Sequence, residues 1–299
     1  PKIVIALKSK KNFSKVNETN KKKILNNLFS LNGYKDFNQN LESKEIKLNL
    51  SESSVSDIEK IVKGHNSIIH LAYIRPDKER DPNNIDNEID SFDQENKNVI
   101  MANKIYKAAF KNNVERIIVA SSNHAADWYE HYEVHEKKLD MVRTDMLPYS
   151  DNFYGWAKAS YELLSLPYAS GKFGRKMEFI HVRIGFPREI DEKIQSNKFI
   201  SNNNGEGIKN IKRHLGAYVS QRDLSDLFSK ALSVEKVIGS LNDVPYLVVY
   251  GVSDNTRRFW SLESARKFLN FYPKDDSEKK FNSLIKNYEN LDEWEGRLG

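Results

Sequence analysis

The sequence predicts an α/β fold, a doubly wound parallel sheet with a smaller C-terminal substrate lobe. Two observations predict it. Short apolar, strand-like runs alternate with helical patterns over residues 1–185, and no apolar run approaches the roughly 18 residues of a membrane span. At 299 residues the chain reaches about the upper limit of one hydrophobic core. We therefore expect a sheet domain over residues 1–186 and a smaller lobe over residues 187–299, interleaved in one structural unit.

The first half of the chain supplies the first strands of this sheet. Strand patterns occur at residues 2–7 (KIVIAL), 44–50 (KEIKLNL) and 66–72 (NSIIHLA). Helical spacing of apolar residues predicts helices over residues 17–31, ended by Asn32-Gly33, and 54–62, capped by Ser54. The acidic, turn-rich segment 76–96 is expected to form a surface loop or lid.

The second half continues the alternation. Further strand patterns lie at residues 114–120, 177–184 and 245–250. Helical patterns cover residues 98–112, 152–165, 220–232 and 261–269. The helix that begins at residue 152 is expected to break near Pro167, and the Asn- and Gly-rich residues 190–207 are expected to form a loop.

Composition excludes several function classes. With no cysteine, the chain has no disulfide framework, thiolate zinc site, iron–sulfur cluster or cysteine nucleophile. The net charge of +5 comes from interspersed charges of both signs, which favours a solvated surface over a nucleic-acid interface. We see neither a signal peptide nor a membrane span and expect a cytoplasmic protein.

A Tyr and a Lys four residues apart are the most informative local pattern. Tyr154 and Lys158 share one face of a predicted helix, where the ammonium is expected to lower the pKa of the phenol so that it acts as a general base. Ser122, at the end of a neighbouring strand, can bind the same substrate oxygen. The alternative is a solvated helix face. The order strand, SSN, loop, Tyr-x-x-x-Lys helix and strand favours the catalytic interpretation, in which a nicotinamide moves the hydride.

With these residues the sequence resembles the extended short-chain dehydrogenase/reductase family, which includes sugar epimerases and dehydratases, and within it the uronate dehydrogenases. The matching segments are IIHLA (68–72), Asn98, VERIIVASSNH (114–124), YGWAK (154–158), VRIG (182–185), KRHLGAYVS (212–220), YGVSDN (250–255) and FWSLESARKFLNFYPKD (259–275). The resemblance implies a Rossmann-like dinucleotide-binding domain over residues 1–186 and NAD or NADP as cofactor.

The resemblance also implies a role for each matching residue. Ser122, Tyr154 and Lys158 would be catalytic, and Lys158 would also bind the cofactor ribose. The other implied cofactor contacts are Leu71, Ala72, Asn98 and Ile184, with Asp36 as a further possible ribose ligand. The implied substrate contacts are Asn123, His124 and Arg213, the last pairing with a carboxylate. Simpler interpretations stay open: Asn98 as a helix cap, His124 as a strand-end histidine, and Arg213 as one cation in a basic run.

The first turn departs from the family. Residues 6–13 (ALKSKKNF) contain no glycine where the family has a Gly-rich turn, and side chains there would push a pyrophosphate away. Three explanations remain open. In the first, Lys8, Lys10 and Lys11 replace the glycines by binding the phosphates through their charge. In the second, the site takes a different or smaller ligand, and in the third, the chain has lost dinucleotide binding. Met101 also replaces a usual glycine.

A further departure is Arg75, which stands where uronate dehydrogenases have a small polar substrate contact. It is a candidate for binding an anionic substrate, with two alternatives: it binds a carboxylate of a partner, or it only covers the loop. The segments 76–96 and 123–153 are longer than the family pattern, which suggests a remodelled mouth of the site.

The leading hypothesis is an NAD(P)-dependent oxidoreductase acting on a sugar or sugar acid. The alternatives are a non-catalytic scaffold that has lost dinucleotide binding and a sugar epimerase or dehydratase. A homodimer through helices 98–112 and 152–165 is expected, with a monomer as its alternative. We expect no metal site, because His131 and His135 lie in an acidic segment that favours solvated surface.

Overall fold

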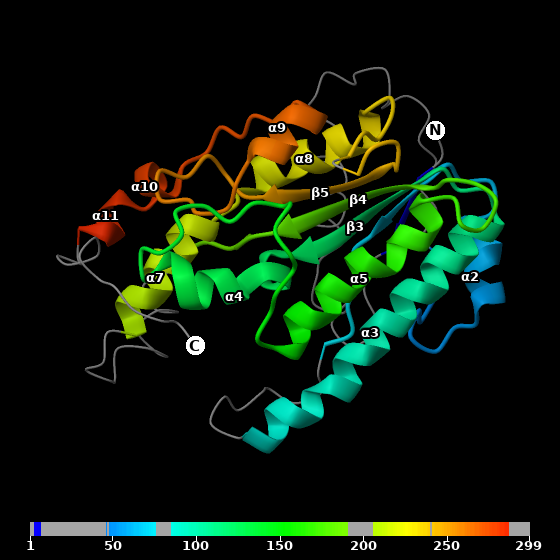
Figure 1. Cartoon of the computed structure of the whole chain (residues 1–299), viewed down its shortest axis with the longest axis horizontal. Coiled ribbons are helices and arrows are strands. Elements are labelled where there is room, and N and C mark those ends of the chain that lie inside the picture. Colours follow the sequence, from blue (N-terminus) through cyan, green and yellow to red (C-terminus); the bar gives the residue numbers. More distant parts are fainter. Residues whose placement is uncertain are drawn as a thin grey trace.

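The computed structural model describes residues 3–6, 46, 48–75, 85–190, 206–239 and 241–286. The predicted helix 17–31, Asp36 and the glycine-free turn after residue 6 lie outside these residues. Five strands of the described part form one parallel sheet in the order β1-β2-β3-β4-β5 (Figure 1). They are β1 (Ile3–Ala6), β2 (Ser67–His70), β3 (Arg116–Ser122), β4 (Glu178–Ile184) and β5 (Tyr246–Gly251).

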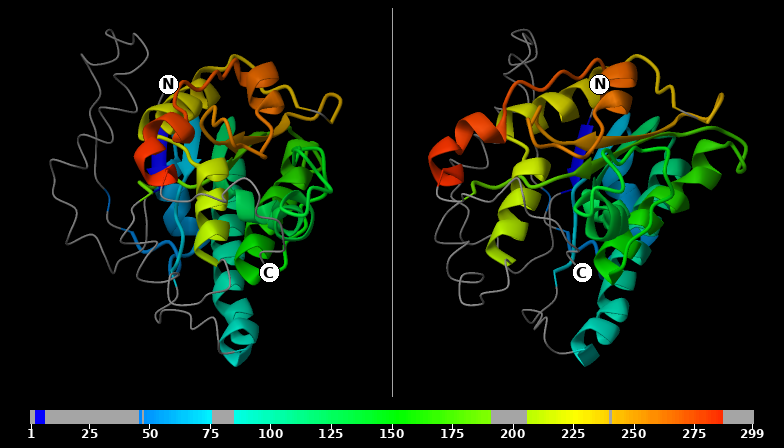
Figure 2. Two further views of the ribbon diagram at one scale, coloured as in Figure 1. Left: turned by 90° about the vertical axis from the view of Figure 1, so that its left-hand side faces the viewer. Right: turned by 60° about the vertical axis from the view of Figure 1, so that its left-hand side comes forward.

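Helices cover both faces of the sheet, which confirms the doubly wound α/β fold. One face is covered by α2 (Val55–Val62), α3 (Ile85–Lys111) and α5 (Phe153–Ala169), with α3 and α5 side by side (Figure 2). The other face is covered by α8 (Gln221–Ser233) and α9 (Glu263–Leu269). The remaining helical segments are η3 (Asn123–Ala126), α4 (Asp127–Tyr129), the π-helical η4 (Glu130–Val134), α7 (Glu206–Ala217), α10 (Ser277–Lys280) and α11 (Asn282–Ile285).

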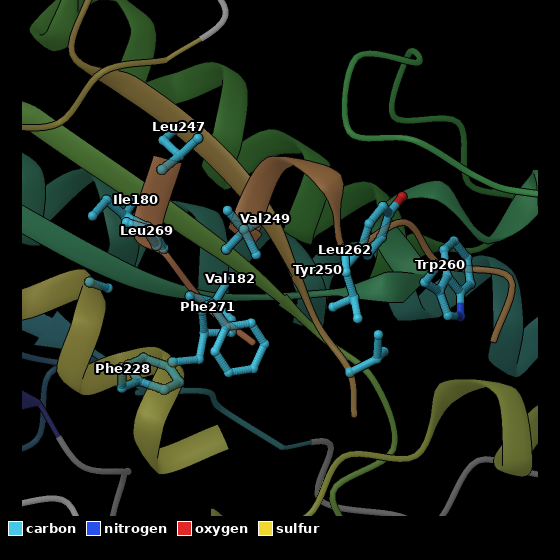
Figure 3. Close-up of a cluster of buried hydrophobic side chains, with 14 of the residues drawn as sticks. Ile180, Val182, Phe228, Leu247, Val249, Tyr250, Trp260, Leu262, Leu269 and Phe271 are labelled. Carbon is cyan, nitrogen blue, oxygen red and sulfur yellow. The ribbon is translucent and has the colours of Figure 1, made fainter. Parts of the chain in front are cut away.

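Successive strand residues enter two different cores. On β4, Phe179 packs under α3 and α5, whereas Ile180 and Val182 pack under α8 and α9, where Phe228 and Leu269 meet them (Figure 3). Because both faces are covered, apolar residues point to both sides of the strands, and polar residues such as Arg183 interrupt the runs without alternating regularly. This explains why the sequence shows them as β-branched runs.

The expected surface loop over 76–96 is wrong for its described part, since α3 begins at Ile85 and not near Asn98. The face of α3 that turns inward here is polar: Ser91, Glu95 and Asn98 are spaced by four and three residues and are 7%, 0% and 0% exposed. A helix that buries polar side chains leaves no apolar periodicity, so the sequence pattern misses its first half.

Three smaller expectations also fail. Helix α5 continues through Pro167 to Ala169, because a proline in the last turn removes only the bond to the carbonyl of Leu163, on the exposed side. The described residues 46 and 48–50 form no strand, and Leu48 and Leu50 pack instead against the core under α2 and α3. Helix α7 begins at Glu206, inside the expected loop.

The C-terminal segment contributes to the main sheet. Strand β5 pairs with β4, while Ile211, Leu215, Tyr218 and Phe281 form a small separate core with Ile190. The predicted boundary between two domains at residue 186 is not tested by this sheet, because β5 lies beyond the boundary and still pairs with β4. No helix of the described residues combines the length and apolarity needed to cross a bilayer.

A buried ion pair fixes α5 to the sheet. Glu162 of α5 accepts hydrogen bonds from Arg183 Nε at 2.9 Å and Nη2 at 2.8 Å, and from Ser121 Oγ at 2.7 Å. Arg183 Nη1 donates to the Tyr250 hydroxyl at 2.9 Å. Burial raises the pKa of Glu162, but the Arg183 charge and the hydrogen bonds outweigh it and the pKa is lowered. One helix residue is thus bonded to β3 and β4 and, through Arg183, to β5.

Replacing Glu162 by glutamine should leave the Arg183 charge buried without compensation. We expect Glu162→Gln to lower the free energy of unfolding by about 3 to 5 kcal/mol, measured by denaturant unfolding followed by circular dichroism. The double variant Glu162→Leu/Arg183→Met, which removes both charges, should recover most of this loss. A loss below about 1 kcal/mol in Glu162→Gln would show that the pair does not hold the helix.

Candidate active site

The carboxyl ends of the strands bring the predicted catalytic residues together. Ser122 ends β3, and Asn152 caps α5 so that Tyr154 lies in its first turn. The Ser122 hydroxyl lies close enough to the Tyr154 phenol to act on its pKa. Lys158 Nζ lies 5.7 Å from the centroid of the Tyr154 ring and donates to Ala120 O at 3.0 Å. The three side chains thus form one cluster at the sheet edge.

The expected lowering of the Tyr154 pKa is wrong. Burial raises the pKa of this phenol, and although the Ser122 hydrogen bond and the charges of Arg188 and Arg75 lower it, the net direction is upward. Burial lowers the pKa of Lys158 to about 8, opposed by the charge of Glu95. At neutral pH the cluster therefore contains a protonated phenol and, in the larger part of the molecules, an ammonium.

Two further rings flank Tyr154. Tyr73 and His124 each meet it edge-to-face at 5.4 Å between centroids, with interplanar angles of 85° and 72°. The Tyr73 hydroxyl donates to Glu95 Oε1 at 2.7 Å, and the Tyr73 ring also lies 5.3 Å from Lys158 Nζ. The sequence analysis missed Tyr73 and Glu95. Tyr73 directly follows the IIHLA segment, and that adjacency is the signal that could have found it.

Asn98 lies inside α3 and does not open or cap it, so that expectation is wrong. Its amide accepts from Ile74 N at 2.7 Å and donates to Ile74 O at 3.1 Å, which fixes the chain after β2. The other proposed cofactor contacts lie at the carboxyl ends of β2 and β4, where Ala72 is buried and Leu71 and Ile184 are half-buried. Met101 is buried in the core under α3.

Arg213 is already paired with the protein. Its Nε lies 2.9 Å from Oε1 of Glu130, a carboxylate with no exposed surface. Burial raises the pKa of Glu130, but the Arg213 charge and the neighbouring histidines outweigh it and lower the pKa. The Nη groups of Arg213 take no part in this contact, and Nη2 lies 3.5 Å from His124 Nδ1. Arg213 is therefore not one of several solvated cations in a basic run.

The other proposed substrate contacts border the same cluster. Asn123 is buried next to Ser122 and accepts from its hydroxyl at 3.4 Å, whereas Arg75 is exposed after β2. Arg188, which the sequence analysis missed, is also exposed and its charge acts on the Tyr154 phenol as that of Arg75 does. Positive charge thus acts on the phenol from two segments of the chain, those that follow β2 and β4.

His131 and His135 are buried, so the expectation of solvated surface is wrong. Segment 123–134 is helical and turns these side chains inward, where they are 9% and 2% exposed. His131 Nδ1 lies 2.7 Å from Asp151 Oδ2, and ligand atoms of Asp127, His131 and Asp151 lie within 4.8 Å of one another. A hydrogen bond accounts for the His131–Asp151 contact without a metal ion. The expected absence of a metal site stays a prediction.

A parallel sheet with Ser, Tyr and Lys side chains at its carboxyl edge has the form of a Rossmann-like dehydrogenase of the short-chain type. No protein-family profile matches the sequence. The chain is 30% identical over 226 residues to the NAD-dependent glucose-6-phosphate dehydrogenase of Haloferax volcanii, spanning 72% of this chain and 70% of that protein. It is also 30% identical over 176 residues to the uronate dehydrogenase of Pseudomonas syringae pv. tomato, of which it spans 50%.

Two solved structures show the same fold. The glucuronic acid dehydrogenase from Chromohalobacter salexigens matches with a TM-score of 0.57 at 22% identity, covering 83% of this chain and 77% of that one. The uronate dehydrogenase from Agrobacterium tumefaciens matches with a TM-score of 0.56 at 24% identity, covering 84% and 77%. Together with the Haloferax relative, these matches show that the chain belongs to the extended short-chain dehydrogenase/reductase family.

The ionisation of Lys158 is directly measurable. Because the Glu95 carboxylate stabilises the ammonium, Glu95→Gln should lower the pKa of Lys158 further below about 8. Carbon-detected NMR titration of lysine-labelled protein measures this pKa, and Lys158→Met assigns the signal. Glu59→Gln, a surface change on α2, is the control and should leave it unchanged. A Lys158 pKa that rises in Glu95→Gln would contradict the assigned charge interaction.

Proposed function

We propose that the chain is an NAD(P)-dependent oxidoreductase that acts on a carbinol carbon of a sugar or sugar acid. The observation that supports it most is the cluster in which the Ser122 hydroxyl and the Lys158 ammonium both lie beside the Tyr154 phenol. Both hydroxyls can bind one substrate oxygen, and the phenol can exchange a proton with it. The similarity to NAD-dependent sugar dehydrogenases supports the same reaction class.

The residues at the sheet edge fit a dinucleotide. Among the described residues, Lys158 Nζ has Ala120 O as its single hydrogen-bond acceptor, so a buried ammonium keeps donors for a hydroxyl-rich ligand such as a ribose. Leu71 and Ile184, which are half-buried, offer apolar surface at the same edge, whereas Ala72 is buried in the core. When bound, the nicotinamide accepts or donates the hydride. The proposal includes that the chain still binds NAD or NADP although its first turn contains no glycine.

The charges around the phenol favour an anionic substrate. Arg213 offers its Nη groups, and Arg75 and Arg188 are exposed cations whose charges act on Tyr154. A sugar carrying a carboxylate or a phosphate would meet these groups while its carbinol lies at Tyr154. Two of the relatives act on such compounds by their names, a sugar phosphate in one case and a uronate in the other.

Activity assays test the proposal directly. With NAD or NADP and a panel of uronates and sugar phosphates, we expect reduced nicotinamide to form, followed by its absorbance. Tyr154→Phe should lower kcat by about 10²- to 10⁴-fold because the proton exchange is lost. Tyr272→Phe, an exposed phenol on another surface, is the control and should change kcat less than twofold.

Binding calorimetry separates this proposal from the scaffold alternative. Absence of binding heat with millimolar NAD and NADP, together with no turnover of any panel compound, would contradict the enzyme assignment. Turnover without net reduction of the nicotinamide, detected by product analysis, would instead support the epimerase or dehydratase alternative.

We also propose a homodimer through α3 and α5. The two helices expose Ile89, Ile100 and Leu163, which are 62%, 48% and 54% exposed. Light scattering should therefore give twice the chain mass of 34.7 kDa, and Leu163→Glu should shift the protein toward that single-chain mass. Leu241→Glu, elsewhere on the surface, should not. A single-chain mass for the unmodified protein at micromolar concentration would contradict the dimer.

The cytoplasmic location expected from the sequence also stays a prediction.

A further inference from the structure

A buried carboxylate, Asp127, lies behind His124. Asp127 begins α4 and has no exposed surface. Its Oδ2 accepts a hydrogen bond from His124 Nδ1 at 2.8 Å and another from Asn152 Nδ2 at 2.8 Å. Neither the sequence pattern nor the resemblance pointed to Asp127.

The contact decides which ring nitrogen of His124 carries the proton. A carboxylate oxygen accepts only, so at 2.8 Å His124 Nδ1 must be the donor, which leaves Nε2 of the neutral ring with the lone pair. Arg213 Nη2 lies 3.5 Å from the same Nδ1, but a guanidinium can only donate. It therefore cannot accept the Nδ1 proton in place of Asp127. The His124 side chain is 34% exposed although its Nδ1 faces buried Asp127.

Asp127 also contacts the start of the helix that presents Tyr154. Asn152, which donates to Asp127, accepts from Gly155 N at 3.0 Å with its Oδ1 and so caps α5. The two segments approach closely here, because a Cβ on Gly155 would lie 2.0 Å from the carbonyl oxygen of His124. Asp127 is therefore bonded both to the ring that flanks Tyr154 and to the cap of its helix.

We propose that Asp127 is a positioning residue that holds His124 with Nδ1 protonated and Nε2 available as an acceptor beside Tyr154. The group that fits this acceptor is a hydroxyl next to the reacting carbinol, so the substrate is a vicinal diol, as in a sugar ring. This substrate assignment rests on the proposed function, whereas the assignment of the His124 proton does not.

The first measurement is the protonation of the ring nitrogens. In nitrogen-15 NMR of histidine-labelled protein, with His124→Gln to assign the signals, neutral His124 should show protonated Nδ1 and a lone pair on Nε2. Asp127→Asn, whose amide can donate or accept, should populate the opposite form. Asp151→Asn is the matched control: it removes a carboxylate that also contacts Asn152 but pairs with His131, and it should leave the His124 signals unchanged.

The second measurement is kinetic. With a vicinal-diol substrate, Asp127→Asn should lower kcat/KM about 10- to 100-fold, whereas a substrate analogue lacking the neighbouring hydroxyl should lose less than threefold. Asp151→Asn should change kcat/KM less than twofold. A merely structural role would affect both substrates alike, so an equal loss overturns the proposal.

The outcomes separate the two levels of inference. If the unmodified chain shows no dehydrogenase activity, the proposed function fails, and the NMR experiment still decides the assignment of the His124 proton. If unmodified His124 carries its proton on Nε2, or if Asp127→Asn leaves the ring signals unchanged, the positioning role of Asp127 is wrong.

Discussion

The buried ion pair between Glu162 and Arg183 is the interaction on which the arrangement of the site depends. Glu162 lies one helical turn after Lys158 on α5, and its bonds to Ser121 and Arg183 attach that helix to two strands at once. Desolvating two charges is costly, and an apolar pair could hold the helix as tightly. The hydrogen bonds of the ion pair are directional, so they favour one height of α5 relative to the end of β3, where Ser122 lies beside Tyr154.

Buried carboxylates recur around this site, and each is bonded to a group that faces it. Glu95 binds the Tyr73 hydroxyl, Asp127 binds His124, and Glu130 binds Arg213. The hydrogen bonds to Glu95 and Asp127 restrict the orientation of Tyr73 and His124, whereas Glu130 holds Arg213 by an ion pair. These buried carboxylates therefore orient the two rings and the guanidinium that lie near the phenol, as the supporting residues of a preorganised binding site do.

Sequence reasoning succeeded where a side chain's place follows from chain geometry alone. Ser122 ends a strand and Tyr154 and Lys158 share a helix face, so their meeting at the sheet edge was predictable. It failed where burial involves polar groups. The first half of α3 buries Glu95, and segment 123–134 buries His131, so neither shows an apolar period. The Tyr154 pKa was predicted in the wrong direction because spacing reveals the nearby ammonium but not the desolvation of the phenol.

The proton on Tyr154 links substrate charge to the direction of the reaction. The charges of Arg188 and Arg75 lower the pKa of the phenol, against the effect of burial. An anionic substrate bound to these arginines would neutralise part of their charge, so the pKa would rise further on binding. The protonated phenol is the form that donates a proton to a carbonyl oxygen, as reduction requires, whereas oxidation requires the phenolate. A bound anion thus cancels part of the effect by which these arginines favour the phenolate, so oxidation in the proposed reaction should gain from higher pH.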